Sequence, residues 1–159
     1  MISIRRIDLV KPEELEEALA IVDRVFREFI APDYSPEGVA EFLDFIRVDP
    51  FREKLDSGER EMWLALDDDV VVGLMGLRCE NHICLFFVDS TCHHQGVGRA
   101  LYNAVLEHLR SIGREFVTVY SSPYAVDVYR RMGFTQVSEQ TTFHGMVSTP
   151  MCAYIFEAV

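Results

Sequence analysis

Two glycines, Gly96 and Gly98, separate an apolar run from a helical pattern, and this spacing could hold a negatively charged group. Residues 83–89 are predicted to form a buried strand, and residues 95–109 are predicted to form a helix. Glycine lets the backbone approach a bound group closely, and the first N–H groups of a helix lack partners within the helix. These free donors, together with the helix dipole, predict a phosphate-binding turn.

Two familiar nucleotide-binding patterns do not fit this turn. The dinucleotide fingerprint needs a third glycine at position 101, where this chain has Leu101. The phosphate loop of nucleotide hydrolases needs a Gly-Lys-Ser or Gly-Lys-Thr sequence, which the chain lacks. A nucleotide-binding protein of another fold stays open as an alternative.

The histidines and cysteines near the turn do not form a metal-binding pattern. His93 and His94 follow Cys92 directly, and this spacing matches no familiar zinc site. The four cysteines include no Cys-x-x-Cys pair and are expected to be reduced thiols. The sequence therefore predicts no metal.

Composition and charge indicate a globular domain with a strongly acidic surface. The 159 residues are 49% hydrophobic and 26% charged, which is typical of one domain spanning residues 1–159. The formal net charge of -11 disfavours nucleic acid and favours a cationic partner, such as a polyamine, an amino group or a basic peptide. No apolar run reaches the roughly 18 residues that span a membrane, and no basic-then-apolar leader opens the chain, so we expect a cytoplasmic protein without a membrane partner.

The spacing of apolar residues predicts an α/β (α+β) fold with the element order β-αα-βββ-α-β-α-ββ. We expect about seven strands in a mixed central sheet and about four helices. The helices are predicted near residues 12–29, 39–46, 95–109 and 124–132, with the second ending before Pro50. The strands are predicted near residues 2–7, 62–66, 70–77, 83–89, 116–120, 134–137 and 152–156.

Two motifs in this order resemble those of the GCN5-related N-acetyltransferase family. The first family motif is Gln or Arg, two residues, Gly, one residue, then Gly or Ala, and the segment from His93 to Gly98 matches its glycines with histidine at the first position. The second is Ala, three residues, Tyr, three residues, then Gly-Phe, and it matches Ala125, Tyr129, Gly133 and Phe134. The resemblance covers essentially the whole chain, because the predicted element order is also that of the family.

The resemblance implies that acetyl-CoA, or another acyl-CoA, is the cofactor. Its pyrophosphate would lie on the backbone amides of residues 95–100, and its pantetheine arm would bond to the backbone near Phe87 and Val88, where the fourth and fifth strands separate. The implied cofactor-binding residues are Phe87, Val88, His93, His94, Gln95, Gly96, Val97, Gly98, Arg99, Ala100, Ser122 and Tyr129.

The implied reaction is the direct transfer of an acyl group from the thioester sulfur to an amine. Such a reaction needs a deprotonated amine, a donor for the carbonyl oxygen and a proton or hydrogen bond for the departing thiolate. Tyr129 matches the motif tyrosine whose hydroxyl would serve the thiolate. His82 is the candidate base, because it lies eleven residues before His93, where members resembling the histone-acetylating branch carry a catalytic carboxylate; water alone is the other possibility.

The acceptor pocket is expected, by the same resemblance, between the first two helices and the last hairpin. Phe29, Asp33 and Tyr34 would line it from one side and His144 from the other. The acceptor is expected to be a small-molecule amine or a protein amino group, and the chain is expected to be a monomer or homodimer. The alternative function is a non-catalytic acyl-CoA-binding regulatory module, which would need the glycines but neither Tyr129 nor His82.

Overall fold

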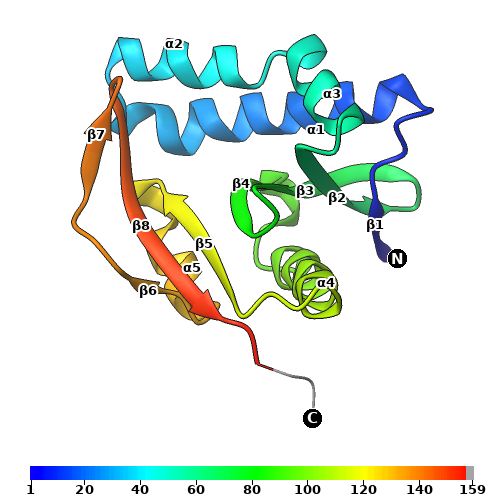
Figure 1. The fold of residues 1–159 in the computed structure, drawn as a ribbon. Coiled ribbons are helices and arrows are strands. Elements are labelled where there is room, and N and C mark those ends of the chain that lie inside the picture. The colour runs from blue at the N-terminus through cyan, green and yellow to red at the C-terminus, as the bar shows by residue number, and fades with distance from the viewer. Residues whose placement is uncertain (157–159) are drawn as a thin grey trace.

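A mixed sheet runs through the molecule and separates two groups of helices (Figure 1). The computed structural model describes residues 1–156. Within that range the strands follow the order β1-β2-β3-β4-β5-β8-β6, and β7 pairs with β8. The strands are β1 (Ile2–Arg6), β2 (Arg60–Asp67), β3 (Val70–Arg78), β4 (His82–Val88), β5 (Phe116–Ser121), β6 (Thr135–Gln136), β7 (Thr141–Phe143) and β8 (Met146–Tyr154).

Each face of the sheet has its own hydrophobic core. Figure 1 shows α1 (Pro12–Val25), α2 (Pro36–Phe45) and α3 (Val48–Asp56) on one face, with α4 (Val97–Ser111) and α5 (Val126–Arg131) on the other. Side chains of β4 alternate between the two cores: Leu85 and Phe87 pack with α1, whereas Phe86 and Val88 pack with α4. The strand β4, which was predicted to contact the cofactor, is therefore held in place by packing on both of its faces.

The first helix is longer than its regular α-helical part. Pro12 occupies the first turn, where its missing N–H is not needed, and Leu15, Leu19 and Val22 form the buried stripe. The chain then continues through a π-helical turn (Phe26–Ile30) and a short 3-10 helix (Ala31–Asp33). A π-helical turn inserts an extra residue and is frequent at functional sites. The predicted helix over residues 12–29 is confirmed in extent.

A partly buried ion pair ties β1 to the start of α1. Arg5 donates to both carboxylate oxygens of Glu14, at 2.9 and 2.6 Å, and the backbone N–H of Asp8 donates to the same carboxylate at 3.0 Å. Glu14 is buried, and the hydrogen bonds from Arg5 hold its pKa below the usual value. The carboxylate is therefore ionised and fully partnered inside the fold.

The helix α3 was not predicted, because Pro50 was interpreted as the end of α2. In the structure Pro50 lies in the first turn of α3, where a proline disturbs no hydrogen bond within the helix. The C-terminal region also differs, since β7 and β8 form a hairpin around His144 and Gly145, whose φ angles are 49° and 78°. The sheet thus has eight strands instead of about seven, and residues 1–156 contain five α-helices instead of about four.

Beyond Ile83, β4 and β5 separate. The two parallel strands pair only at His82 with Thr118 and at Ile83 with Val119. The pairing of β3 with β4 shifts at the same level, so that Cys84 is an extra residue in β4. From this bulge onward the edge of β4 that faces β5 has no strand partner among the described residues. The gap between the strands opens toward the turn that carries Gly96 and Gly98.

None of the helices in residues 1–156 combines the length and the apolar character needed to cross a bilayer.

Candidate active site

The start of α4 presents backbone donors that have no partner. Gly96 precedes the helix with a φ of 80°, and the first helical hydrogen bond there runs from the N–H of Ala100 to the carbonyl of Gly96. The N–H groups of Val97, Gly98 and Arg99 make no hydrogen bond within residues 1–156. A cradle of free donors at a helix N-terminus favours a phosphate.

Gly98 lets β4 approach the cradle closely. A Cβ atom at this position would lie 2.9 Å from Cζ of Phe86, closer than side chains tolerate. Phe86 lies in the gap between β4 and β5, where its ring packs 5.9 Å from that of Tyr129. Because Gly98 has no side chain, the free N–H groups at the start of α4 can lie directly beside the gap between β4 and β5.

The loop from β4 to α4 is held in place by its own side chains. Asp89 accepts hydrogen bonds from the N–H and the hydroxyl of Thr91 and a further one from Arg24 of α1, at 3.0, 2.8 and 2.8 Å. These bonds, led by that of the Thr91 N–H, keep the pKa of Asp89 below its usual value. On the other side of the loop, Nε2 of His93 lies 2.8 Å from the carbonyl of Val88. The cradle is therefore preorganised.

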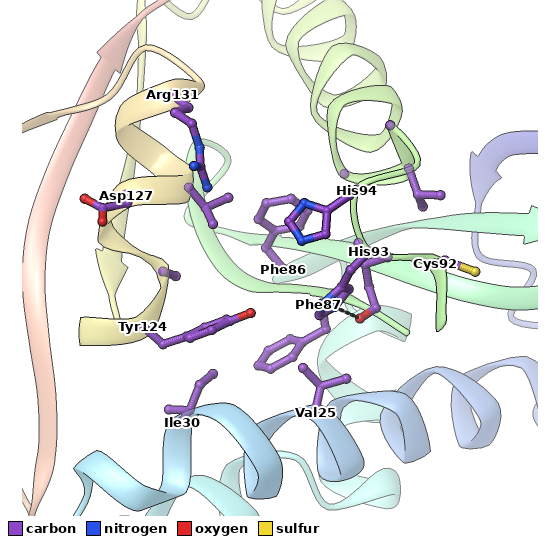
Figure 2. Close-up of a pocket in the computed structure, with 16 residues that line it drawn as sticks. Val25, Ile30, Phe86, Phe87, Cys92, His93, His94, Tyr124, Asp127 and Arg131 are labelled. Atoms are coloured by element: carbon purple, nitrogen blue, oxygen red, sulfur yellow. Dashed lines mark hydrogen bonds between the residues drawn. The ribbon is translucent and has the colours of Figure 1, made fainter. Parts of the chain in front are cut away.

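A cavity of about 400 Å³ extends from the cradle along β4 to the start of α5 (Figure 2). Figure 2 shows His93 and His94 entering it from the loop, Tyr124 from the opposite wall, and Val25 and Ile30 from the helix below. Of the predicted cofactor residues, this larger cavity is lined by Phe87, Val88, His93, His94, Gly96, Val97 and Gly98. The structure brings these residues together around one space.

Five predicted cofactor residues do not line this larger cavity: Ser122 and Tyr129 line a smaller cavity described below, and Gln95, Arg99 and Ala100 line neither. The side chain of Gln95 is exposed and donates to the carbonyl of Thr91 at 3.2 Å, while Arg99 donates to the carbonyl of Arg131 at 3.2 Å. The N–H of Ala100 is already used within the helix, so the expectation that it belongs to the free cradle is wrong. Val88 lines the cavity, but its carbonyl is occupied by His93.

An aromatic group closes the larger cavity between α1 and α5. Phe29 stacks on Tyr124 with ring centroids 5.0 Å apart and lies 5.6 Å from His93. Phe29 was predicted to contact the acceptor, but it lines neither of the two cavities described here. It supports the wall of the larger one instead.

A smaller cavity of about 80 Å³ adjoins the larger one within the gap. The two share Ile30, Phe86, Phe87 and Ala125, so they meet where β4 and β5 separate. The smaller cavity is also lined by Tyr129, Ser122, Tyr34, Tyr120 and Cys84. A group bound along β4 could therefore reach Tyr129 at the junction.

Tyr129 is buried and protonated at neutral pH. Its side chain is 4% exposed, and burial raises its pKa above the usual range, with smaller contributions from Cys84 and Tyr102. Its hydroxyl makes no hydrogen bond within residues 1–156, so it is free to donate to a bound group. Burial also raises the pKa of Cys84 to about 11, which keeps this thiol protonated beside it.

His82 does not have the properties expected of a base. It lines neither cavity, and its Nδ1 lies 2.8 Å from the hydroxyl of Thr118. Burial, followed by the charge of Arg78, lowers its pKa to about 4. The prediction of a pKa suited to general-base catalysis is therefore wrong, because sequence alone does not show that the ring is partly buried beside an arginine.

The other residues predicted for the acceptor are divided between cavity and surface. Tyr34 lines the smaller cavity, and burial is the main cause of its raised pKa. Asp33 is exposed and outside both cavities, and His144 is exposed on the β7–β8 turn, 3.7 Å from Glu37.

Sequence reasoning missed several residues of the walls, chiefly Phe86, Tyr124, Arg131 and Cys84. Tyr124 and Arg131 lie inside or directly beside the second motif, and that placement was the available signal. The extra residue at Cys84 depends on a strand bulge, which no local pattern indicates.

Comparisons with known proteins agree with this geometry. The acetyltransferase (GNAT) domain model matches residues 30–154. No curated protein matches the chain. Among solved structures, the fold is similar to that of PaiA N-acetyltransferase from Thermoplasma acidophilum in complex with coenzyme A, at 16% identity and a TM-score of 0.79, covering 97% of this chain and 99% of that one.

Two further structures are similar over nearly their whole length. The apo-form of YjaB from Escherichia coli has 27% identity, a TM-score of 0.69 and coverage of 99% of each chain. An aminoglycoside 6'-N-acetyltransferase complexed with coenzyme A has 14% identity, a TM-score of 0.70 and coverage of 99% of each chain. The domain model covers most of the sequence, and it confirms the resemblance seen in the two motifs. The chain therefore belongs to the GCN5-related N-acetyltransferase family and is an acyltransferase whose cofactor is acetyl-CoA.

Proposed function

We propose that this protein transfers the acetyl group of acetyl-CoA directly to a primary amine of a small molecule or a protein. The observation that carries the proposal is the joining of two cavities at the gap between β4 and β5. The larger one begins at free helix N–H donors, and the smaller one ends at residues suited to an acceptor. Two substrates that enter from opposite sides would meet at the gap.

The residues of the larger cavity fit the cofactor. The N–H groups of Val97, Gly98 and Arg99 would hold the pyrophosphate, with the dipole of α4 behind them. The unpaired edge of β4 would accept the extended pantetheine arm as a further strand-like partner. When bound, acetyl-CoA supplies a thioester whose carbonyl carbon is the electrophile.

Tyr129 is proposed to donate a hydrogen bond to the departing thiolate. It lies at the junction of the cavities, its hydroxyl has no partner within residues 1–156, and its raised pKa keeps the proton in place at neutral pH. Cys84 is not a competing nucleophile, because its pKa of about 11 keeps the thiol protonated.

No side chain of this site is assigned as the base. His82 is outside both cavities and has a pKa of about 4, so we propose that the amine loses its proton to water. The rate at limiting acceptor should then rise with pH toward the pKa of the amine, about 10 for a lysine-like group, without a step near pH 6.5. A His82→Ala variant with an altered pH profile would contradict this assignment.

Calorimetry with acetyl-CoA, followed by thiol-release assays with a panel of amines, tests the proposal. We expect Tyr129→Phe to lower kcat roughly 10-fold to 150-fold, the equivalent of one hydrogen bond to a charged group, and to leave the acetyl-CoA Kd within about twofold. Tyr102→Phe is the matched control, because Tyr102 is equally buried but lines neither cavity. Cofactor binding without thiol release from any amine would favour a regulatory acyl-CoA-binding module instead.

A further inference from the structure

A row of polar side chains crosses the sheet at the end of β4 that is far from the cradle. Arg60 of β2 pairs with Arg78 of β3, Arg78 pairs with His82 of β4, and His82 pairs with Thr118 of β5. Residues paired in this way have their side chains on the same face of a sheet. All four side chains are partly exposed, so the row reaches solvent.

The two arginines of this row have no anionic partner. Arg60 stacks over the rings of Phe45 and Phe51, at 4.6 and 4.7 Å, which places the row on the face that carries α1, α2 and α3. Arg78 lies 6.0 Å from the ring centre of Tyr120. Neither guanidinium forms an ion pair or a hydrogen bond within residues 1–156.

This arrangement is unfavourable unless an anion binds there. Like charges directly opposite each other on paired strands repel, and Arg60 and Arg78 are such a pair. Guanidinium groups offer a planar set of donors that matches carboxylate and phosphate oxygens. The stacking on Phe45 and Phe51 fixes the position of Arg60 without using its N–H groups.

The row adjoins the smaller cavity and not the cofactor cradle. Tyr120 lines that cavity and packs 4.6 Å from His82, and Cys84 lines it two residues farther along β4. Arg78 pairs with His82, which is two residues from Cys84 of this wall, and Arg60 pairs with Arg78 on the next strand. The far end of β4 at Val88 is about 20 Å from His82 at ~3.3 Å per residue, so the pyrophosphate cannot be the partner of these arginines.

We propose that the acceptor is an amine that also carries an oxyanion group, a carboxylate or a phosphate, which Arg60 and Arg78 bind. This inference rests on the proposed acetyltransferase function and names its substrate class. It reverses the expectation from the net charge of -11, because the local charge beside the acceptor cavity is positive. The guanidinium groups select the substrate, and they place its amine toward the gap.

Matched pairs of amines test the proposal. Thiol release is measured for amino acids against their carboxamides, and for O-phosphoethanolamine against ethanolamine, so that the two arms separate a carboxylate from a phosphate. We expect kcat/KM to be at least tenfold higher for the anionic member of one pair. Arg78→Gln should remove that preference while leaving the acetyl-CoA Kd unchanged. The matched control is Arg47→Gln, because Arg47 is an exposed arginine that pairs with Asp44.

Binding of the anionic amine is measured separately by calorimetry at constant ionic strength with saturating coenzyme A. Binding that weakens at least tenfold in Arg78→Gln supports the anion site even if no thiol is released, and that combination would contradict the proposed function alone. Equal turnover of anionic and neutral amines, or binding that Arg78→Gln does not change, would overturn the inference and leave the acetyltransferase function standing. Because Arg60 also packs on Phe45 and Phe51, Arg60→Gln is interpreted only if its melting temperature matches that of the wild type.

Discussion

Replacing Gly98 by alanine tests whether the free N–H groups at the start of α4 depend on the close contact with Phe86 in the gap between β4 and β5. The added Cβ would lie 2.9 Å from Cζ and 3.4 Å from Cε1 of Phe86, so either Phe86 or the start of α4 must move by about 0.5 Å or more to reach ordinary contact. If Phe86 moves, it intrudes on the junction of the cavities, which it lines on both sides. If the start of α4 moves, the free N–H groups leave the position of the phosphate.

The cost should fall on binding more than on folding. Gly98 lies within α4 and has no positive φ, so alanine gains about 1 kcal/mol of helix propensity while the overlap costs roughly 1–3 kcal/mol. Stability should therefore fall by about 2 kcal/mol at most, or several degrees in Tm. A shift that breaks one hydrogen bond between the start of α4 and the phosphate costs about 1.5–3 kcal/mol. This loss would raise the acetyl-CoA Kd roughly 10-fold to 150-fold.

Calorimetry with acetyl-CoA on the wild type and on Gly98→Ala measures this effect. Asn103→Ala is the control, since Asn103 is an exposed residue of the same helix and lines neither cavity. Its Kd should equal that of the wild type. A Gly98→Ala variant that folds normally and binds acetyl-CoA within twofold of the wild type would refute the coupling of cradle and gap.

Three further changes have expected outcomes. Glu14→Gln should lower the free energy of unfolding at pH 7 by about 1–2 kcal/mol, a moderate figure because the partner Arg5 is 40% exposed and water screens the pair. The folded-state pKa of Glu14 lies below 4.5, so this stabilisation is present above the unfolded-state pKa and is lost as the pH falls through the folded-state pKa. The difference in unfolding free energy between wild type and variant, measured in urea, should therefore decrease below about pH 4.5. A difference that does not change with pH would contradict this. Gly38→Ala should separate α2 from the β7–β8 turn, because its Cβ would overlap the carbonyl of Gly145. Phe42 of α2 lines the smaller cavity, so we expect a higher KM for the acceptor and an unchanged acetyl-CoA Kd. An unchanged KM in a folded variant would count against a role of α2 in the acceptor site. His93→Ala removes the hydrogen bond to Val88 and should raise the acetyl-CoA Kd several-fold in the same calorimetric assay, whereas an unaltered Kd would show that the loop holds its shape without it.

The strand, turn and helix around Gly96 could be predicted because each leaves a local pattern. The apolar run of β4, the glycines and the spacing of apolar residues in α4 all fall within one continuous segment. Gly113, with a φ of 78°, follows that helix as expected for a residue that ends it. Features that depend on neighbours in sequence were therefore accessible before the structure was known.

Features that depend on neighbours in space were not accessible. The partial burial of His82 beside Arg78 follows from the register of three strands, and that register places Arg60 in the same row. Pro50 gives the same local signal whether it ends a helix or lies in the first turn of the next one. Local patterns thus predicted the turn at which we propose that the cofactor binds, whereas the proposed acceptor end depends on the packed sheet.

An amide NMR titration with acetyl-CoA shows whether the start of α4 binds the cofactor, because the signals report on the individual backbone groups there. We expect the largest shifts at the amides of Val97, Gly98 and Arg99, which have no hydrogen-bond partner within residues 1–156, and smaller shifts along β4 from Phe86 to Val88. Tight binding that leaves these amides unshifted, or no binding at all, would contradict this expectation.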